Sequence, residues 1–342
     1  MTTCCDSQAP AKRGRFDAVV TFNRPLCREH FLLRMRVTGP APFPATQPGQ
    51  FIQLGCRAPH GFAGADALFG QSLDWEPGQV PHLAQPELCD RVAFLRRPFS
   101  LAGRGEDAGE GGATWFEVVH RVVGVGTRWL SQLKPGDPVD LIGPLGNQFA
   151  LTPGKSLALL VGGGVGLPPM FYLAEALRRA GWDAVGFVGA LTRDLLAVTF
   201  RDGVPPDAQG APRPSVAEFA RHGYPAVITT DDGSIGLRGR ITAGLERVLQ
   251  SLSPTDLARV VVYTCGPEPM MHAVAKLAKA HRVDCQVCLE QAMACGMATC
   301  QSCIVKIEDA AKPHGVTDHG RPWRFKLACT DGPVFPAEMV VW

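Results

Sequence analysis

Hydrophobic positions along the chain follow two different patterns, and the change falls near residue 153. Before it, short apolar or alternating segments are separated by Pro and Gly, at residues 16–22, 30–37, 49–55, 114–123 and 137–143. Such segments predict strands, and short strands joined by these turns predict a small antiparallel β-barrel. Residues 127–137 have helical spacing and end at Pro-Gly. The pattern therefore predicts a barrel domain over residues 15–152.

Continuous apolar runs alternate with amphipathic segments over residues 153–284. The predicted strands are 156–163, 184–191, 225–233 and 259–267, and the predicted helices are 168–181, 241–252 and 267–282. Strands that alternate with helices are typical of a parallel α/β sheet. A second domain with this architecture is therefore expected.

Four further segments complete the expected domain organisation. Residues 1–14 have the character of a disordered tail, and residues 57–96, rich in Gly, Pro and Asp, predict a loop insertion in the barrel domain. Residues 201–216 predict a surface loop within the α/β domain. Residues 285–342 form a cysteine-rich C-terminal domain, so the chain is predicted to be multidomain.

Composition and charge narrow the possible partners. The chain has 342 residues, 46% apolar and 19% charged, with a formal net charge of +2. This balance provides no electrostatic reason to expect nucleic acid or an anionic membrane as a partner. The uncharged run 156–174 is interrupted by three consecutive glycines and two prolines, so a buried strand–turn–helix fits it better than a membrane span. The N-terminus lacks the apolar stretch of a signal peptide, and a cytoplasmic location is expected.

The cysteines are clustered in a way that predicts a metal site. Six of the twelve lie between residues 285 and 329, and disulfides are rare in a reducing compartment. Two different sets of four cysteines could bind the metal. One set could form a zinc site and consists of Cys285, Cys288, Cys300 and Cys303. The other set has the C-x4-C-x2-C…C spacing of a plant-type [2Fe–2S] cluster and consists of Cys295, Cys300, Cys303 and Cys329.

The local sequence favours the iron–sulfur set. The segment around Cys285 and Cys288 has the pattern of a strand, where these two side chains would point to opposite faces. The stretch from Cys295 to Cys303 is instead a loop of small residues, which can wrap backbone N–H groups around cluster sulfurs. Zinc, or no metal, remains the alternative at this stage.

Two glycine-rich turns in the α/β domain predict a nucleotide site. Gly162, Gly163, Gly164 and Gly166 lie where a buried strand turns into a helix, and the free N–H groups of a helix N-terminus suit a phosphate. A second turn, Cys265-Gly266-Pro267, follows another buried strand and should face the same crevice. Leu167 occupies the last glycine position of a G-x-G-x-x-G motif, so that motif in its usual form is absent. A glycine-rich turn without a ligand, and a structural thiol at Cys265, remain alternatives.

Three motifs in the barrel domain suit a second anionic ligand. They are Arg97-Pro98-Phe99-Ser100, the G-x-G-T at Gly124–Thr127 after a strand, and the glycine-rich turn at 143–149. Arginine can pair with a pyrophosphate, serine can hydrogen-bond a flavin, and a helix N-terminus attracts anions. Taken singly, each motif is also compatible with an ordinary turn or a surface salt bridge.

The order of these motifs along the chain resembles the ferredoxin–NADP reductase superfamily. In that superfamily an antiparallel barrel binds FAD and an α/β domain binds a nicotinamide nucleotide. The resemblance covers roughly residues 15–285 and implies FAD contacts at Arg97, Pro98, Phe99, Ser100, Val119, His120, Arg121, Gly126 and Thr127. It assigns the nicotinamide nucleotide to the two glycine-rich turns of the α/β domain. The sequence alone does not separate NAD from NADP, since Arg193 could meet a 2′-phosphate.

The C-terminal segments "CLEQAMACGMATCQSCIVKI" and "FKLACTDGPVF" resemble the electron-transfer subunits of class 1B dihydroorotate dehydrogenases. This resemblance implies a subunit of pyrimidine (UMP) biosynthesis that passes electrons from the FMN of a catalytic subunit, by way of [2Fe–2S] and FAD, to NAD+. It also implies a heterotetramer with two copies of each subunit. No carboxylate pair or nucleophile–base motif for dihydroorotate oxidation is evident, so no catalytic residue is assigned. The expected architecture is a β-barrel FAD domain, an α/β nucleotide domain and a small [2Fe–2S] domain.

Two other functions remain open at the level of sequence. One is a different FAD/[2Fe–2S] reductase, such as the small subunit of an electron-bifurcating ferredoxin:NADP oxidoreductase. The other is a sensor or binding protein whose nucleotide sites have lost their activity.

Overall fold

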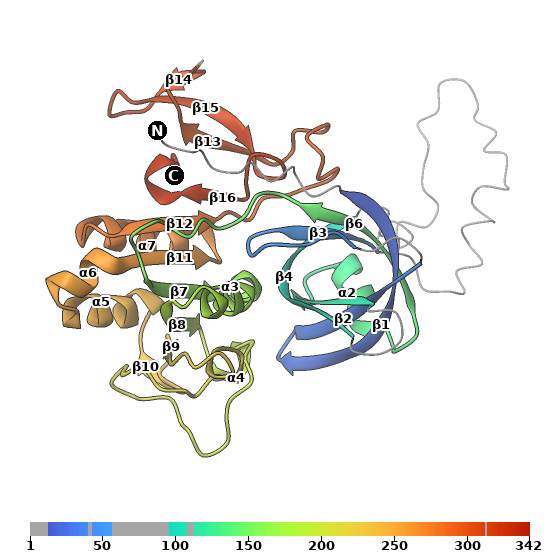
Figure 1. Ribbon diagram of the computed structural model, residues 1–342, viewed down its shortest axis with the longest axis horizontal. Helices are drawn as coiled ribbons and strands as arrows, with labels where there is room; N and C mark the ends of the chain where they lie inside the picture. The colour runs from blue at the N-terminus through green and yellow to red at the C-terminus, as the bar shows by residue number, and fades with distance from the viewer. Residues whose placement is uncertain (1–12, 40–42, 57–95, 108–112, 312) are drawn as a thin grey trace, which may run out of the picture.

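A computed structural model describes residues 13–39, 43–56, 96–107, 113–311 and 313–342 (Figure 1). The tail predicted at 1–14 and the insertion predicted at 57–96 lie outside these ranges except for residues 13, 14 and 96. The described residues form a β-barrel, a larger sheet flanked by helices and a small three-stranded sheet. The predicted combination of an antiparallel barrel with a parallel-sheet domain is confirmed.

The barrel is closed by six antiparallel strands in the order β1-β2-β5-β4-β3-β6. Their bounds are β1 Gly14–Cys27, β2 His30–Thr38, β3 Phe51–Gly55, β4 Arg97–Glu106, β5 Thr114–Arg121 and β6 Pro138–Leu145. Alternate residues of β2, Leu33, Met35 and Val37, point into the core, as expected from the period of two. Helix α2 (Val125–Gln132) adds Leu130 to the same core.

The second domain is built on a seven-stranded sheet in the order β10-β9-β8-β7-β11-β12-β16, parallel except for β16. The strands are β7 Leu157–Gly163, β8 Asp183–Ala190, β9 Ala226–Thr230, β10 Leu237–Arg238, β11 Val260–Cys265, β12 Asp284–Cys288 and β16 Val334–Pro336. The helices are α3 Leu167–Arg179, α4 Ala217–Ala220, α5 Ile241–Ser251, α6 Pro254–Arg259 and α7 Glu268–Ala280. Since sequential strands alternate with helices, parallel pairing is the expected result.

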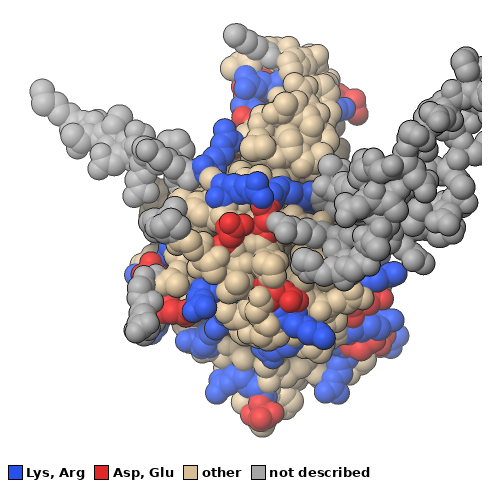
Figure 2. Space-filling view, turned by 90° about the vertical axis from the view of Figure 1, so that its right-hand side faces the viewer, with Lys and Arg blue, Asp and Glu red and all other residues tan. Residues whose placement is uncertain are grey.

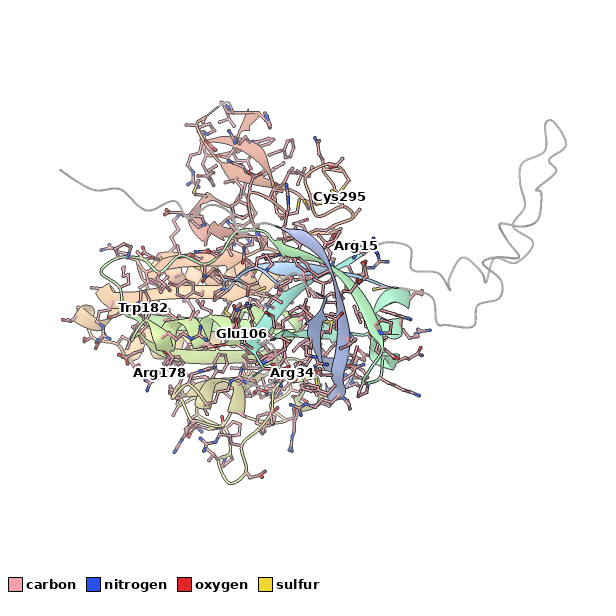
Figure 3. All side chains as sticks on the ribbon, turned by 45° about the vertical axis from the view of Figure 1, so that its right-hand side comes forward. Arg15, Arg34, Glu106, Arg178, Trp182 and Cys295 are labelled. Carbon is pink, nitrogen blue, oxygen red and sulfur yellow. The ribbon has the colours of Figure 1, made fainter. Side chains whose placement is uncertain are left out.

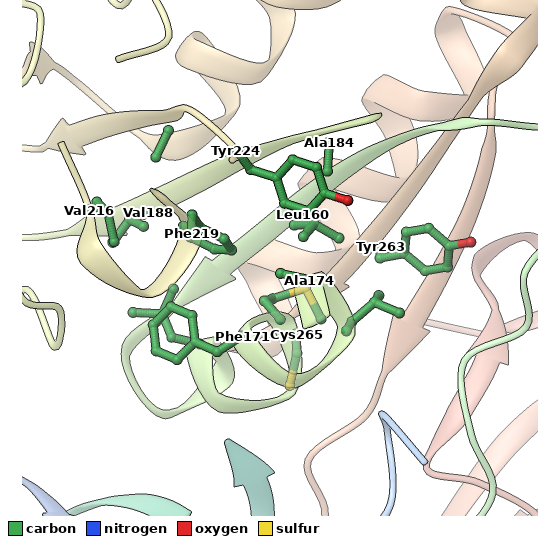
Figure 4. Packing of buried hydrophobic residues seen from close by; sticks show 14 of the residues in the cluster. Leu160, Phe171, Ala174, Ala184, Val188, Val216, Phe219, Tyr224, Tyr263 and Cys265 are labelled. Atoms are coloured by element: carbon green, nitrogen blue, oxygen red, sulfur yellow. The ribbon is translucent and has the colours of Figure 1, made fainter. Parts of the chain in front are cut away.

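One apolar cluster joins the sheet to the barrel through α3. Leu160 of β7 and Phe171 of α3 are buried in it with Phe219, and the rings of Phe171 and Phe219 lie 5.3 Å apart, edge to face (Figure 4). Ala102 of β4 and Val119 of β5 belong to the same cluster. The two domains therefore share a continuous core.

The C-terminal part of the chain is fastened to the nucleotide sheet at both of its ends. Strand β12, which carries Cys285 and Cys288, lies parallel to β11, so a boundary drawn at residue 285 cuts through the nucleotide sheet. The chain then forms the small antiparallel sheet β13-β15-β14, and β16 returns beside β12 (Figure 1). The small strands are β13 Ile304–Glu308, β14 Gly315–Val316 and β15 Pro322–Leu327.

Charges of both signs are interspersed over the face of the molecule seen in Figure 2. Among the described residues, no helix is long and apolar enough to cross a bilayer.

Replacement of Leu160 by Ala tests the shared core. The side chain is fully buried, so the change should lower the free energy of unfolding by about 2–5 kcal/mol. Leu151 is 39% exposed, and Leu151→Ala, the matched control, should change it by less than about 0.5 kcal/mol. Urea-induced unfolding measures both, and equal effects of the two substitutions would contradict the assignment of Leu160 to the core.

Candidate functional site

The four cysteines of the predicted iron–sulfur set are brought together from two parts of the C-terminal domain. Cys295, Cys300 and Cys303 lie on the loop between β12 and β13, and Cys329 follows β15. Cys303 and Cys329 are both buried, and their thiols interact with each other. Cys300 is exposed, and Cys295, labelled in Figure 3, is partly exposed.

The backbone of this loop directs N–H groups at the sulfurs. Gly296, Ala298 and Gln301 have φ values of +66°, +72° and +55°, and this left-handed backbone turns the loop inward. The amides of Met297 and Cys300 donate to the Cys295 sulfur at 3.4 and 3.3 Å. N–H donors of this kind stabilise thiolates that ligate iron. The loop therefore has the donor set that a negatively charged cluster requires.

Hydrogen bonding also makes the exposed thiol acidic. The Ser302 hydroxyl lies 3.2 Å from the Cys300 sulfur. This contact, with contributions from Cys295 and from the Ser302 amide, lowers the pKa of Cys300 to about 6. A thiolate is the form that binds metal, so Cys300 is in its ligating form near neutral pH.

The two cysteines of the alternative zinc set are engaged elsewhere. Cys288 is buried opposite Cys265 in the register of β11 and β12, and their thiols interact. Cys285 packs into different apolar clusters from Cys288, as the strand pattern predicts. Among the described residues, which include both cysteine sets, no group of three His, Cys, Asp or Glu side chains is placed to hold one metal ion.

The barrel motifs meet at one end of the barrel. The rings of Phe99 and His120 lie 6.2 Å apart. A Cβ atom on Gly126, in the first turn of α2, would lie 3.5 Å from the Arg97 side chain. The R-P-x-S and G-x-G-T motifs, remote in sequence, therefore border one region.

His120 carries buried polar atoms that the protein itself does not satisfy. Its side chain is 1% exposed, stacks on Phe31, and has no hydrogen-bond partner at either ring nitrogen. Burial, with the nearby His30, lowers the pKa of His120 to about 4. Since unpaired buried polar groups are costly, these nitrogens fit a ligand with its own donors and acceptors, such as the ring edge or ribityl chain of a flavin.

Other residues expected at the flavin are placed differently. Val119 points to the opposite face of β5 from His120 and lines a pocket of about 320 Å³ beside Phe171. Arg121 is exposed and forms an ion pair with Glu29 at 2.9 Å. Pro98 and Ser100 are placed by strand pairing, since they lie opposite Gln53 and Phe51 in the register of β3 and β4. The Thr127 hydroxyl accepts a hydrogen bond from the amide of Val123 at 2.9 Å.

The glycine-rich turn at 143–149 contacts the C-terminal segment. Asn147 donates to the carbonyl of Val334 and accepts from its amide, both at 2.8 Å. A Cβ atom on Gly146 would lie 2.6 Å from Pro333. This turn, which the sequence analysis grouped with the flavin motifs, thus holds the chain that follows Cys329.

The two turns of the predicted nucleotide site are in direct contact. Cys265 lies opposite Gly162 in the register of β11 and β7. A Cβ atom on Gly166 would lie 2.1 Å from the Cys265 carbonyl, which leaves room for glycine alone.

The second turn requires glycine for a related reason. Gly266 has a φ of +150°, and a Cβ there would lie 3.2 Å from the Gly163 carbonyl. Gly164 has a φ of +56° and open space around it. The N-terminus of α3 and the turn at Pro267 are therefore close together at the carboxyl ends of β7 and β11, where ligands bind in such sheets.

A pocket of about 550 Å³ continues this edge of the sheet. Its lining includes Arg193 after β8, which the sequence already indicated, and three residues that the sequence did not assign to the site, Asp194 after β8 and Asp232 and Ser234 after β9. The amide of Arg193 donates to the Ser234 hydroxyl at 2.8 Å. The sequence could have indicated these residues by their place after predicted parallel strands, because ligands bind at the carboxyl ends of such strands.

Comparison with known proteins was made at three levels. Residues 290–341 match the model of the iron-sulfur cluster binding domain of dihydroorotate dehydrogenase B. The chain is 36% identical over 268 residues to the dihydroorotate dehydrogenase B (NAD(+)) electron transfer subunit of Geobacillus thermodenitrificans, covering 78% of this chain and 87% of that protein. The subunit of the same name from Caldanaerobacter subterraneus subsp. tengcongensis is 32% identical, covering 81% of this chain and 94% of that protein.

Two reductases are among the solved structures that share the fold. A chain of the NADH-dependent reduced ferredoxin-NADP oxidoreductase matches with a TM-score of 0.64 and 25% identity, covering 95% of this chain and 90% of that chain. The ferredoxin reductase of carbazole 1,9a-dioxygenase matches with a TM-score of 0.54 and 19% identity, covering 80% of this chain and 68% of that chain. The second likeness concerns the fold alone.

Substitution of Cys288 separates the two metal sets, because Cys300 belongs to both. Cys288→Ser should keep the cluster, since Cys288 contacts Cys265 rather than the loop, whereas Cys300→Ser should lose it. Iron analysis and the visible absorption spectrum under anaerobic conditions measure the difference. Loss of iron in Cys288→Ser, or full retention of iron in Cys300→Ser, would contradict the assignment.

The buried His120 should make stability depend on pH. Between its ordinary pKa of 6.5 and about 4, the unfolded chain binds a proton that the folded protein excludes. The free energy of unfolding should therefore fall as pH drops through this window, by roughly 3 kcal/mol in total from His120. Urea unfolding at pH 7 and pH 5 should show a smaller difference in His120→Phe than in the wild type. An identical difference in both would contradict the argument.

Proposed function

The chain belongs to the family of dihydroorotate dehydrogenase B (NAD(+)) electron transfer subunits, and we propose that it connects an FMN-containing catalytic subunit to NAD+ through a [2Fe–2S] cluster and FAD. The observation that carries this proposal is the four-cysteine loop with its inward N–H groups, docked on a flavin-reductase fold. Cys295, Cys300, Cys303 and Cys329 would hold the cluster.

The combination of groups explains why one chain carries three sites. An iron–sulfur cluster exchanges single electrons, a nicotinamide takes a hydride, and a bound flavin does either. Two backbone amides of the chain donate hydrogen bonds to the Cys295 sulfur and stabilise negative charge there. The chain keeps water from the buried end of the barrel around His120, which is 1% exposed. At Gly166 and Gly266 it allows the two glycine-rich turns to pack together, and the open space at Gly164 leaves backbone accessible to a nucleotide.

The choice of NAD+ over NADP+ rests on the relatives rather than on the charge of the pocket beside Arg193. This pocket is lined by Asp194 and Asp232 and also by Arg28 and Arg193, and Arg28 pairs with Asp194 at 2.8 Å, so its charges are balanced. The name of the bacterial relatives includes NAD(+).

The catalytic partner would oxidise dihydroorotate, a step for which the sequence shows no evident carboxylate pair or nucleophile–base motif. A heterotetramer with two copies of each subunit, in the cytoplasm, is part of the proposal. A reducing compartment suits cysteines that must remain available as thiolate ligands.

A second candidate is a subunit of a ferredoxin-NADP oxidoreductase. The likeness to the NADH-dependent reduced ferredoxin-NADP oxidoreductase over 95% of this chain favours it. The identity there is 25%, against 36% to the dihydroorotate dehydrogenase B subunit of Geobacillus thermodenitrificans, which makes the first function the stronger one.

Anaerobic spectroscopy with a defined partner tests the proposal. The purified protein should contain FAD and two irons per chain, and NADH should bleach both chromophores. Mixed with a class 1B dihydroorotate dehydrogenase catalytic subunit, it should support NAD+ reduction by dihydroorotate. A protein with zinc and no iron would overturn the cluster assignment. Activity with reduced ferredoxin and NADP+, but none with dihydroorotate, would favour the second candidate.

A further inference from the structure

Gln53 is a polar residue in a position where an apolar residue is expected. It lies in the middle of β3 between Ile52 and Leu54, and all three side chains are fully buried. Its Oε1 atom has no hydrogen-bond partner. Burial of an incompletely satisfied amide costs free energy, so its presence in the barrel wall calls for a compensating role.

The Gln53 side chain reaches the cysteine loop. Its Nε2 donates to the carbonyl of Ala294 at 3.2 Å. A Cβ atom on Gly296 would lie 2.8 Å from both Cδ and Nε2 of Gln53, so the loop packs directly on the amide. Ala294 and Gly296 are the two chain neighbours of Cys295, the first cysteine of the loop.

The backbone of Gln53 belongs to the part of the barrel that carries the flavin motif. In the register of β3 and β4 it lies opposite Pro98, within the Arg97–Ser100 segment. On its other side it lies opposite Ile142 of β6. One residue therefore connects the R-P-x-S strand to the loop around Cys295, and in Figures 1 and 3 this loop lies against the barrel.

We propose that Gln53 is a positioning residue that holds the Cys295 loop on the flavin barrel and raises the reduction potential of the bound cluster. The inference rests on the cofactor sites of the proposed function. The donated N–H offsets the negative end of the Ala294 carbonyl beside Cys295. Without it, the dipole of this partly buried carbonyl disfavours the extra electron of the reduced cluster, because nearby hydrogen bonds and charge set cluster potentials.

Two substitutions of nearly equal size test this role. Gln53→Met removes the donor and should lower the ratio of reduced to oxidised cluster about tenfold at a fixed solution potential, a shift of ~59 mV for one electron. Gln53→Glu places a carboxyl group at the same point and should lower the ratio further. EPR-monitored redox titration measures the cluster, and the FAD absorbance, recorded in parallel, should titrate as in the wild type.

Gln286→Met is the matched control. Gln286 also connects two remote segments, through hydrogen bonds of 2.8 and 2.9 Å to Ala150, but it does not contact the cysteine loop. This variant should leave the cluster ratio unchanged. An unchanged ratio in Gln53→Met, or an equal shift in Gln286→Met, would overturn the proposal.

A second measurement applies even where a variant binds no iron. Hydrogen exchange of the amides of residues 294–297 should be faster in Gln53→Met than in the wild type, and unchanged in Gln286→Met. Equal exchange in all three proteins would refute the positioning role. Absence of iron from the wild type would instead refute the proposed function, while this exchange comparison would still decide the role of Gln53.

Discussion

The apolar contact between helix α3 and barrel strands β4 and β5 is the interaction on which the other sites depend. Phe171 of α3, Val119 of β5 and Ala102 of β4 belong to one buried cluster with Leu160 of the sheet. Because protein cores are close-packed, such a contact fixes the relative position of two domains. The N-terminus of this same helix lies at the glycine turn, so the core contact also fixes the nucleotide site relative to the barrel.

The cysteine domain is held by polar contacts in addition to an apolar cluster in which Phe51 and Leu145 of the barrel pack with Val305. Strand β16 pairs with β12, Asn147 makes two hydrogen bonds to Val334, and Gln53 bonds the loop beside Cys295. Directional bonds of this type specify an orientation more strictly than an apolar surface does. Electron transfer between bound groups needs such a defined orientation, and these contacts come from both of the other domains.

Tight backbone packing and unsatisfied polar atoms occur at the two predicted nucleotide and flavin sites. At Gly166 the Cys265 carbonyl leaves no room for a side chain, so the two glycine-rich turns lie close together. At His120 two ring nitrogens are buried without partners, which costs free energy in the protein alone. A ligand with its own donors and acceptors would offset that cost.

The periodicity of the sequence was enough to predict the architecture, because strands with period two and strands alternating with helices bury different surfaces. The spacing of Cys295, Cys300 and Cys303 was enough to predict a cluster loop, and the strand pattern correctly separated Cys285 from Cys288. Strand periodicity and cysteine spacing are properties of neighbouring residues, so the sequence of each segment is enough to determine them.

Contacts between distant residues were decided only by the tertiary structure. Nothing near Gln53 in the sequence indicates that its side chain hydrogen-bonds Ala294. The glycine-rich turn around Asn147 was grouped with the flavin motifs, and its sequence does not indicate the hydrogen bond to Val334. The pocket beside Arg193 likewise needs two strand ends to lie side by side. Single-sequence patterns report the period and the turn chemistry of each element, whereas packing decides which elements meet.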